Sequence, residues 1–199
     1  MEIRALLLCG GAARRFGSNK LLATIPGEES LGTLVARAAR NLFEGAGPPL
    51  ALVPPGAQGL REALEALGCE VVESDRTVLG MGASLAAAVA ASDRAEGWIV
   101  ALGDMPLIAP ATIRAVRDAV AQGALIAAPA CRRTGVRGHP VGFAAALRPE
   151  LLALSGDVGA REVLQSHRDR LRILPSDDPG ILVDLDTPGQ LAALARTVR

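Results

Sequence analysis

Two glycines and two cations follow the first apolar run of the chain. Residues 3–9 form this run, Gly10 and Gly11 end it, and Arg15 and Lys20 come soon after. Glycine lets a backbone come close to a ligand and exposes N–H donors, and Arg and Lys pair with phosphate oxygens. The pattern predicts a buried strand that leads into a loop holding a nucleoside triphosphate. The alternative is a glycine turn with solvated cations.

The spacing within this loop excludes two common nucleotide motifs. No Gly-Lys-Ser/Thr sequence closes the loop, so it is not a Walker A motif. The G-x-G-x-x-G spacing of dinucleotide-binding turns is also missing. The loop therefore needs another explanation for its glycines and cations.

Acidic residues follow two other apolar runs. Asp104 comes directly after Trp98–Leu102 and Gly103, and a carboxylate at the end of a strand is suited to ligate Mg²⁺. Alternatively, Asp104 caps a helix that begins near Pro110. Asp184 and Asp186 would share one face of a strand, where a cation relieves their repulsion. The alternative for this pair is one helix cap and one solvated side chain.

Two further segments carry polar groups next to glycines. Gly80 and Gly82 precede Ser84 at the start of an alanine-rich helix, where free N–H groups suit a phosphate or carbonyl. An ordinary Ser84 N-cap explains the same residues. His139 and Pro140 follow a stretch, residues 132–137, with three arginines. These arginines either clamp an anionic ligand or form a solvated charge run.

The elements that must position these residues alternate along the chain. This alternation predicts one α/β domain over residues 1–199, with a mainly parallel sheet, helices on both faces, and ligands beyond the carboxyl ends of the strands. The expected strands are 3–9, 50–53, 70–73, 98–102, 125–128, 141–145, 171–174 and 181–183. The expected helices are 31–43, 58–67, 84–91, 111–121, 160–166 and 188–197.

Composition narrows the class of partner. The 199 residues include 21 basic and 21 acidic side chains, and only 2% are aromatic, so neither nucleic acid nor an anionic membrane is expected as a partner. No segment is long and apolar enough to predict a membrane span. The three scattered cysteines, Cys9, Cys69 and Cys131, favour reduced thiols and a cytoplasmic protein.

Several motifs, in order, resemble those of the molybdenum cofactor cytidylyltransferases, which have a three-layer Rossmann-like nucleotidyltransferase fold. The first loop resembles their L-A-A/G-G-x-S-x-R-M/F-G-x-x-K signature, with Cys9 in place of Ala and Ala13 in place of Ser. The other matching segments are residues 80–85 (G-M-G-A-S-L), 102–106 (L-G-D-M-P), 138–143 (G-H-P-V-G-F), 156–161 (G-D-V-G-A-R) and 184–188 (D-L-D-T-P).

The resemblance implies a reaction and a set of roles. CMP would pass from CTP to the terminal phosphate of molybdenum-loaded molybdopterin, releasing pyrophosphate, with Mg²⁺ as cofactor and a recipient molybdoenzyme as a transient partner. Asp104 and Asp186 would ligate Mg²⁺, with Asp184 a weaker candidate. The implied catalytic residues are Arg15, Lys20 and Asp104. The implied nucleotide-binding residues are Leu8, Cys9, Gly10, Gly11, Lys20, Gly80, Gly82, Ser84 and Asp104. The implied acceptor-binding residues are His139, Pro140 and Arg161.

Three alternatives stay open. Cys9-Gly10-Gly11 is similar to the A-G-G start that accompanies guanine use in this group, whereas an A-A-G start accompanies cytosine, so a guanylyltransferase on the same cofactor is the second hypothesis. A sugar-phosphate or alditol-phosphate nucleotidyltransferase is the third. A non-catalytic carrier of the molybdenum cofactor is the fourth, suggested by Ala13 in the place of Ser.

Overall fold

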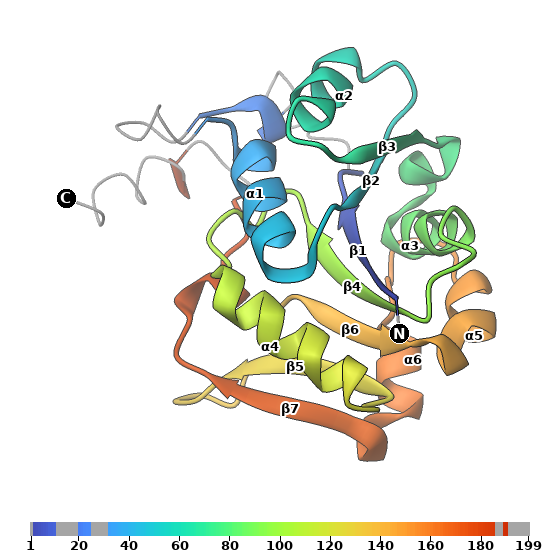
Figure 1. Cartoon of the computed structure of the whole chain (residues 1–199), viewed down its shortest axis with the longest axis vertical. Helices are drawn as coiled ribbons and strands as arrows, with labels where there is room; N and C mark the ends of the chain where they lie inside the picture. The colour runs from blue at the N-terminus through green and yellow to red at the C-terminus, as the bar shows by residue number, and fades with distance from the viewer. Residues whose placement is uncertain (1, 11–19, 25–31, 186–188, 191–199) are drawn as a thin grey trace.

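A twisted, mostly parallel sheet organises the part of the chain that the computed structural model describes, residues 2–10, 20–24, 32–185 and 189–190 (Figure 1). Within these residues the sheet has seven strands in the order β3-β2-β1-β4-β6-β5-β7, and only β6 runs antiparallel to its neighbours. The strands are β1 (Ile3–Leu8), β2 (Leu50–Val53), β3 (Glu70–Glu73), β4 (Gly97–Leu102), β5 (Ile126–Cys131), β6 (Val141–Ala144) and β7 (Leu171–Ser176).

Helices cover both faces of this sheet, which gives three layers (Figure 1). The α-helices are α1 (Leu34–Ala46), α2 (Gln58–Glu65), α3 (Met81–Ala90), α4 (Pro110–Ala121), α5 (Arg148–Leu152) and α6 (Arg161–Ser166). One apolar core lies under α1, α2 and α4, and the other under α3, α5 and α6. Side chains alternate along β1, so that Leu7 enters the first core while Leu6 and Leu8 enter the second.

Small residues let the layers approach closely. A Cβ on Gly45 of α1 would lie 2.6 Å from Cβ of Ile113 on α4, so the contact between these helices requires glycine at this position. At the opposite end of the sheet from the loops after β1 and β4, the buried Trp98 donates its indole N–H to Ser92 Oγ at 2.9 Å, and Arg148 stacks over its ring at 5.0 Å.

The loops that follow β1 and β4 leave the same edge of the sheet. The two strands are parallel neighbours in register from Ile3↔Gly97 to Leu8↔Leu102, and the N–H of Gly103 donates to the carbonyl of Leu8 at 3.0 Å. After β1 the chain builds outward through β2 and β3 and then returns to form β4 on the other side of β1. Such a reversal of strand order opens a crevice beyond the carboxyl ends of the strands.

The predicted three-layer α/β fold is confirmed, and most predicted elements agree within a few residues. One alternative is excluded and one predicted element is wrong. Helix α3 begins at Met81 with Gly80 as its N-cap, so Ser84 lies inside the helix and does not cap it. Residues 181–183 do not form a strand, because Pro179–Leu182 form a 3-10 helix, η6. Most of the expected helix 188–197 lies outside the described residues.

No helix in the described ranges has both the length and the apolar character needed to cross a membrane.

Candidate functional site

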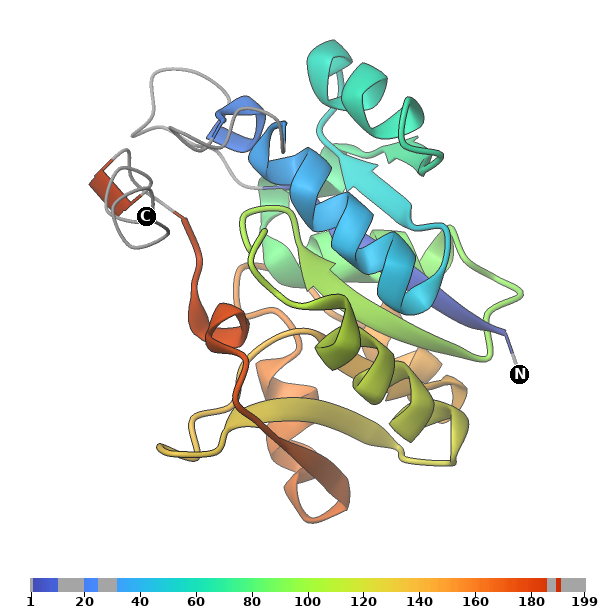
Figure 2. The same ribbon diagram turned by 60° about the vertical axis from the view of Figure 1, so that its left-hand side comes forward.

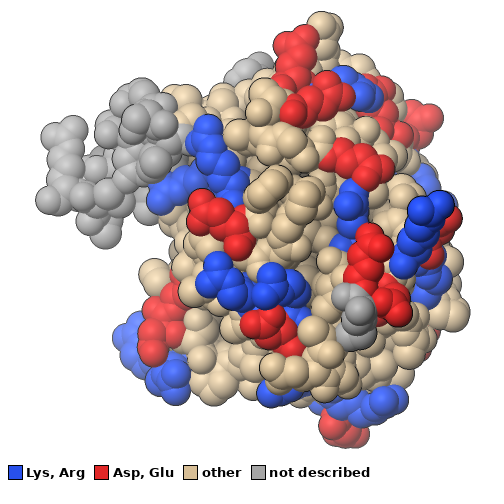
Figure 3. Space-filling view, in the orientation of Figure 1, with Lys and Arg blue, Asp and Glu red and all other residues tan. Residues whose placement is uncertain are grey.

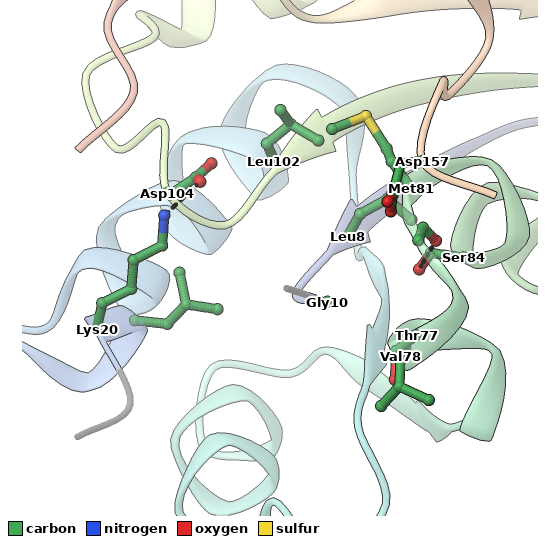
Figure 4. Close-up of a pocket in the computed structure, with 12 residues that line it drawn as sticks. Leu8, Gly10, Lys20, Thr77, Val78, Met81, Ser84, Leu102, Asp104 and Asp157 are labelled. Carbon is green, nitrogen blue, oxygen red and sulfur yellow. Dashed lines mark hydrogen bonds and ion pairs between the residues drawn. The ribbon is translucent and has the colours of Figure 1, made fainter. Parts of the chain in front are cut away.

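The crevice beyond β1 and β4 holds the largest part of the site, a cavity of about 460 Å³ (Figure 4). This volume lies within the range of small-molecule sites. Figure 4 shows Lys20 and Asp104 at one end of it, Gly10 in the middle, and Thr77, Met81 and Ser84 toward the other end. The nucleotide-binding candidates among its lining residues are Leu8, Gly10, Lys20, Gly80, Ser84 and Asp104.

Lys20 and Asp104 form an ion pair in this cavity. Nζ of Lys20, in the short 3-10 helix η1 (Lys20–Leu22), lies 2.8 Å from Oδ2 of Asp104, which follows β4. Their side chains are only 13% and 23% exposed, so water screens the pair less than it screens surface charges. Asp104 does not cap α4, whose first turn receives a carboxylate from elsewhere in the chain. One end of the cavity therefore presents an ammonium group and a carboxylate together.

Two hydroxyl groups at the other end act as hydrogen-bond acceptors toward the cavity. Ser84 Oγ donates to the carbonyl of Gly80 at 2.8 Å, and Thr77 Oγ1 donates to the carbonyl of Ser74 at 2.8 Å. Each hydroxyl has a single proton, so both present lone pairs to a ligand. A Cβ on Gly10 would lie 3.1 Å from Ser84 Oγ and 3.2 Å from Thr77 Cβ, so Gly10 keeps this corner open.

The segment 155–157 closes the cavity over the start of α3. The amide of Gly82 donates to the carbonyl of Gly156 at 2.8 Å, and a Cβ on Gly82 would lie 2.7 Å from the carbonyl oxygen of Ser155. Gly82 therefore packs against this segment, with its N–H already bonded, and does not line the cavity. Asp157 does line it and does not cap α6, since the N-cap there is Ala160 without a side-chain bond.

A second cavity of about 280 Å³ adjoins the first and shares Leu8, Met81, Leu102 and Asp157 with it. It contains two of the predicted acceptor-binding residues, His139 and Arg161, together with Arg137. Pro140 is buried behind His139 and does not line it. Of the other two arginines in the 132–137 segment, neither lines this cavity, and Arg132 pairs with Asp177 at 3.1 Å. The second cavity thus contains two arginines, and it shares the carboxylate of Asp157 with the first cavity.

His139 carries a buried nitrogen in this second cavity. Its Nδ1 is inaccessible to solvent and has no hydrogen-bond partner among the described residues. Burial lowers the pKa of His139, and the positive charge of Arg137 lowers it further. The charges of Asp104 and Asp184 and a hydrogen bond to the Val100 backbone act in the opposite direction but do not cancel the effect of burial. The ring is therefore neutral near pH 7.

The carboxy-terminal acids lie differently from the prediction. Because 183–185 is not a strand, the argument that Asp184 and Asp186 share a strand face does not apply. Asp184 is exposed and lines neither cavity, although its charge reaches His139. Asp186 lies outside the described residues, as do Gly11 and Arg15. Among the residues described, no group of three or more His, Cys, Asp or Glu side chains is arranged to hold a metal ion.

Cys9 contributes packing next to the site. It is 2% exposed, and burial, with help from Cys69 and Asp104, raises the pKa of its thiol far above the ordinary value. The thiol therefore behaves as a small apolar group. On the face that Figure 3 shows, Lys/Arg and Asp/Glu are interspersed without an extended field of one sign.

Sequence reasoning missed one residue of the first cavity and one residue that bonds the start of α4 from outside both cavities. Thr77 is 3% exposed and lines the first cavity, but no motif surrounds it. Asp178 bonds the start of α4 from across the fold. The position of Thr77 in the cavity and the bonds of Asp178 to the start of α4 follow only from the way the chain folds.

Comparisons with known proteins agree with this geometry. The chain resembles the structure of Rv0371c from Mycobacterium tuberculosis H37Rv with a TM-score of 0.82 and 26% identity, over 98% of each chain. The manganese complex of that protein matches with a TM-score of 0.80 and 25% identity, over 99% of this chain and 100% of that one. A nucleotidyl transferase from Methanothermobacter, Mth528, shares the fold with a TM-score of 0.78 and 23% identity, over 98% and 97% of the two chains.

No curated protein is similar enough in sequence to match. The sequence profile of the MobA-like NTP transferase domain matches residues 5–171, which is most of the chain and includes the ends of β1 and β4 with the loops that form the site. The protein therefore belongs to the family of MobA-like NTP transferase domains and is a nucleotidyltransferase of that general kind.

Proposed function

We propose that this single-domain protein transfers CMP from CTP to the terminal phosphate of molybdenum-loaded molybdopterin and releases pyrophosphate. One observation carries the proposal: two cavities share a wall, one with the Lys20–Asp104 pair and the other with His139, Arg137 and Arg161. A transfer between two anionic substrates needs two adjoining sites, and the second of these presents positive charge to an anionic acceptor.

In this proposal the nucleotide occupies the larger cavity. Its base lies near Thr77 and Ser84, and its phosphates lie toward Lys20. Both hydroxyls donate their protons to backbone carbonyls, so toward a base they would act as acceptors, which favours a base with an exocyclic amino group. Cytosine and guanine have such a group and uracil does not.

The reaction is an in-line displacement. An oxygen of the acceptor phosphate forms a bond to the α-phosphorus while the bond from that phosphorus to the β-phosphate oxygen breaks, and pyrophosphate leaves. The attacking phosphate is already ionised, so no general base is needed. Lys20, together with Arg15, would stabilise charge that develops on the leaving group. The protein would act by orienting its substrates and by electrostatics.

The residues present fit a divalent cation, which we propose to be Mg²⁺. Asp104 offers a carboxylate in the cavity, and Mg²⁺ is commonly held by one or two carboxylates plus substrate phosphates. Asp186 would be the second ligand, with Asp184 a weaker candidate. When bound, such a cation neutralises phosphate charge. The manganese complex of the similar Rv0371c supports a divalent-metal requirement.

Gly10 favours one alternative. Cys9-Gly10-Gly11 is similar to the start that accompanies guanine use. A guanylyltransferase on the same cofactor is therefore the second candidate.

The first test measures pyrophosphate release with molybdopterin and Mg²⁺, comparing CTP, GTP and UTP. We expect turnover with CTP and little with UTP. Turnover with GTP alone would replace the proposal by the guanylyltransferase. Tight pterin binding without turnover would favour a carrier that delivers the cofactor to a recipient molybdoenzyme. Absence of both would favour a sugar-phosphate or alditol-phosphate acceptor.

A further inference from the structure

Asp178 bonds three groups on two segments of the chain. Its Oδ2 accepts hydrogen bonds from the backbone N–H of Ala109 at 2.8 Å and from the hydroxyl of Thr112 at 2.7 Å. Its Oδ1 accepts from the N–H of Gly180 at 2.9 Å. Helix α4 has no cap from its own N-cap residue, Ala109, so the carboxylate of Asp178 satisfies its first turn from a distant part of the chain.

Residues 178–185, which we call the strap, pass directly over the loops at the site. Figure 2 shows this orange-red segment leaving β7 beside the loop that joins β4 to α4. Gly180 lies so close to the carbonyl of Leu107 that a Cβ would not fit, and Gly138 lies equally close to the carbonyl of Ile181. The strap is therefore held between the β4–α4 loop and the segment before β6.

The strap also bonds the backbones of two candidate functional residues. The N–H of Leu185 donates to the carbonyl of Asp104 at 3.0 Å, and the N–H of His139 donates to the carbonyl of Ile181 at 3.0 Å. Asp104 lines the first cavity and His139 the second. One segment thus connects both halves of the site, and Asp178 fixes its beginning.

We propose that Asp178 is a positioning residue, which anchors the strap and thereby sets Asp104 and His139 relative to each other. This inference rests on the proposed nucleotidyl transfer for its kinetic consequence. Because transfer depends on close alignment of two bound substrates, a small displacement of either loop reduces turnover more than it reduces nucleotide binding.

Three variants form a graded series. Thr112→Val removes one hydrogen bond and leaves the two backbone bonds of Asp178. Asp178→Asn has one oxygen and cannot accept from both Ala109 and Gly180 through separate oxygens. Asp178→Ala removes all three bonds. Ser92→Ala is the matched control for lost stability, because it removes the partner of Trp98 at the far end of the sheet.

Amide hydrogen exchange, followed by NMR on the full chain, tests the anchoring directly. In Asp178→Ala we expect the amides of Leu185 and His139 to exchange at least about 10-fold faster, while the amides of β1 and β4 keep their protection. Asp178→Asn should be intermediate, and Thr112→Val and Ser92→Ala should leave these two amides as in the wild type. Unchanged exchange at both amides in Asp178→Ala would overturn the proposal.

Kinetics and binding test the consequence. We expect Asp178→Ala to lower kcat on the order of 100-fold with the KM for CTP changed less than about 3-fold. Faster exchange with unchanged kcat would overturn the positioning role, and so would an equal loss of kcat in Ser92→Ala at matched Tm. If the wild type turns over no nucleotide, the proposed function fails, and the exchange rates of the Leu185 and His139 amides then decide the anchoring alone: unchanged rates in Asp178→Ala would reject it.

Discussion

Nζ of Lys20 lies 2.8 Å from Oδ2 of Asp104, and the pair connects the end of the first loop to the end of β4. The two residues are 84 positions apart, and the parallel pairing of β1 with β4 brings them together. In the proposed reaction, phosphates would draw Lys20 away from Asp104 and make its carboxylate available to a cation. Binding of a charged ligand in the cavity would therefore change the Lys20–Asp104 ion pair.

Asp104→Asn should abolish turnover while the fold persists. The amide keeps the shape of the side chain but loses the charge that holds a divalent cation, so we expect pyrophosphate release to fall at least about 100-fold. Asp118→Asn is the matched control, because Asp118 pairs with Arg117 on the exposed part of α4. A carrier protein would bind pterin as before in both variants. Turnover that survives in Asp104→Asn would remove Asp104 from the catalytic residues.

Gly10→Ala tests which base the larger cavity accepts. The new Cβ would lie 3.1 Å from Ser84 Oγ, which is closer than ordinary contacts, and would narrow the corner between Ser84 and Thr77. Because guanine is larger than cytosine, we expect kcat/KM for GTP to fall about 10-fold more than that for CTP. An unchanged ratio of CTP to GTP use would move base selection away from Gly10.

Much of the fold could be predicted because its local signals agree with its topology. Apolar runs that end in glycine or aspartate mark β1 and β4, and their parallel pairing then places Gly10 and Asp104 at one edge. The alternation of strands and helices predicts the edge of the sheet at which these two residues lie. The part of the cavity at Thr77 could not be predicted. Thr77 lies in the 3-10 helix η3 (Asp75–Leu79), which no periodic pattern in the sequence indicates.

The strap shows why the structure of residues 181–183 could not be predicted from the sequence. Ile181, Leu182 and Val183 have the composition of a strand, and the sequence predicts one there. Tertiary contacts decide otherwise: Asp178 bonds Ala109 and Gly180, and the chain turns into η6 against Leu107. The two partners of Asp178 outside its own segment are Ala109, the N-cap of α4, and Thr112 in its first turn, which are too far along the chain for any local pattern to indicate them.

Arg161→Ala should weaken binding of the acceptor and leave binding of the nucleotide unchanged. Arg161 lines the second cavity only, so we expect the KM for molybdopterin to rise about 10-fold, as for loss of one charge-assisted hydrogen bond, with the KM for CTP unchanged. Arg168→Ala is the control, because Arg168 is 78% exposed next to Asp169. Equal rises for both substrates in Arg161→Ala would argue against separate cavities for nucleotide and acceptor.

Cys131 should be the first cysteine to react. Hydrogen bonds from Thr134 and Arg133 lower the pKa of its thiol, whereas burial raises the pKa of Cys69 to about 11 and that of Cys9 still further. The thiolate is the reactive form, so alkylation of Cys131 by iodoacetamide should reach half its maximal rate at a lower pH than for an ordinary cysteine. Mass spectrometry between pH 6 and pH 10 measures this order, and Cys131→Ser should leave the folded protein almost unlabelled at pH 7. Faster labelling of Cys9 in the folded state would contradict its burial.

His139 should make the protein less stable in mild acid. Its pKa is lowered in the folded state, chiefly by burial, so below the unfolded value of about 6.5 the unfolded chain binds a proton that the folded chain does not. Stability is therefore full above that value and is lost as the pH falls from it toward the depressed folded pKa. Urea denaturation of the metal-free protein from pH 8 to pH 5 measures the loss, and His139→Gln should flatten the curve in this window. Parallel curves for the wild type and His139→Gln would mean that His139 takes up its proton in the folded protein as readily as in the unfolded chain.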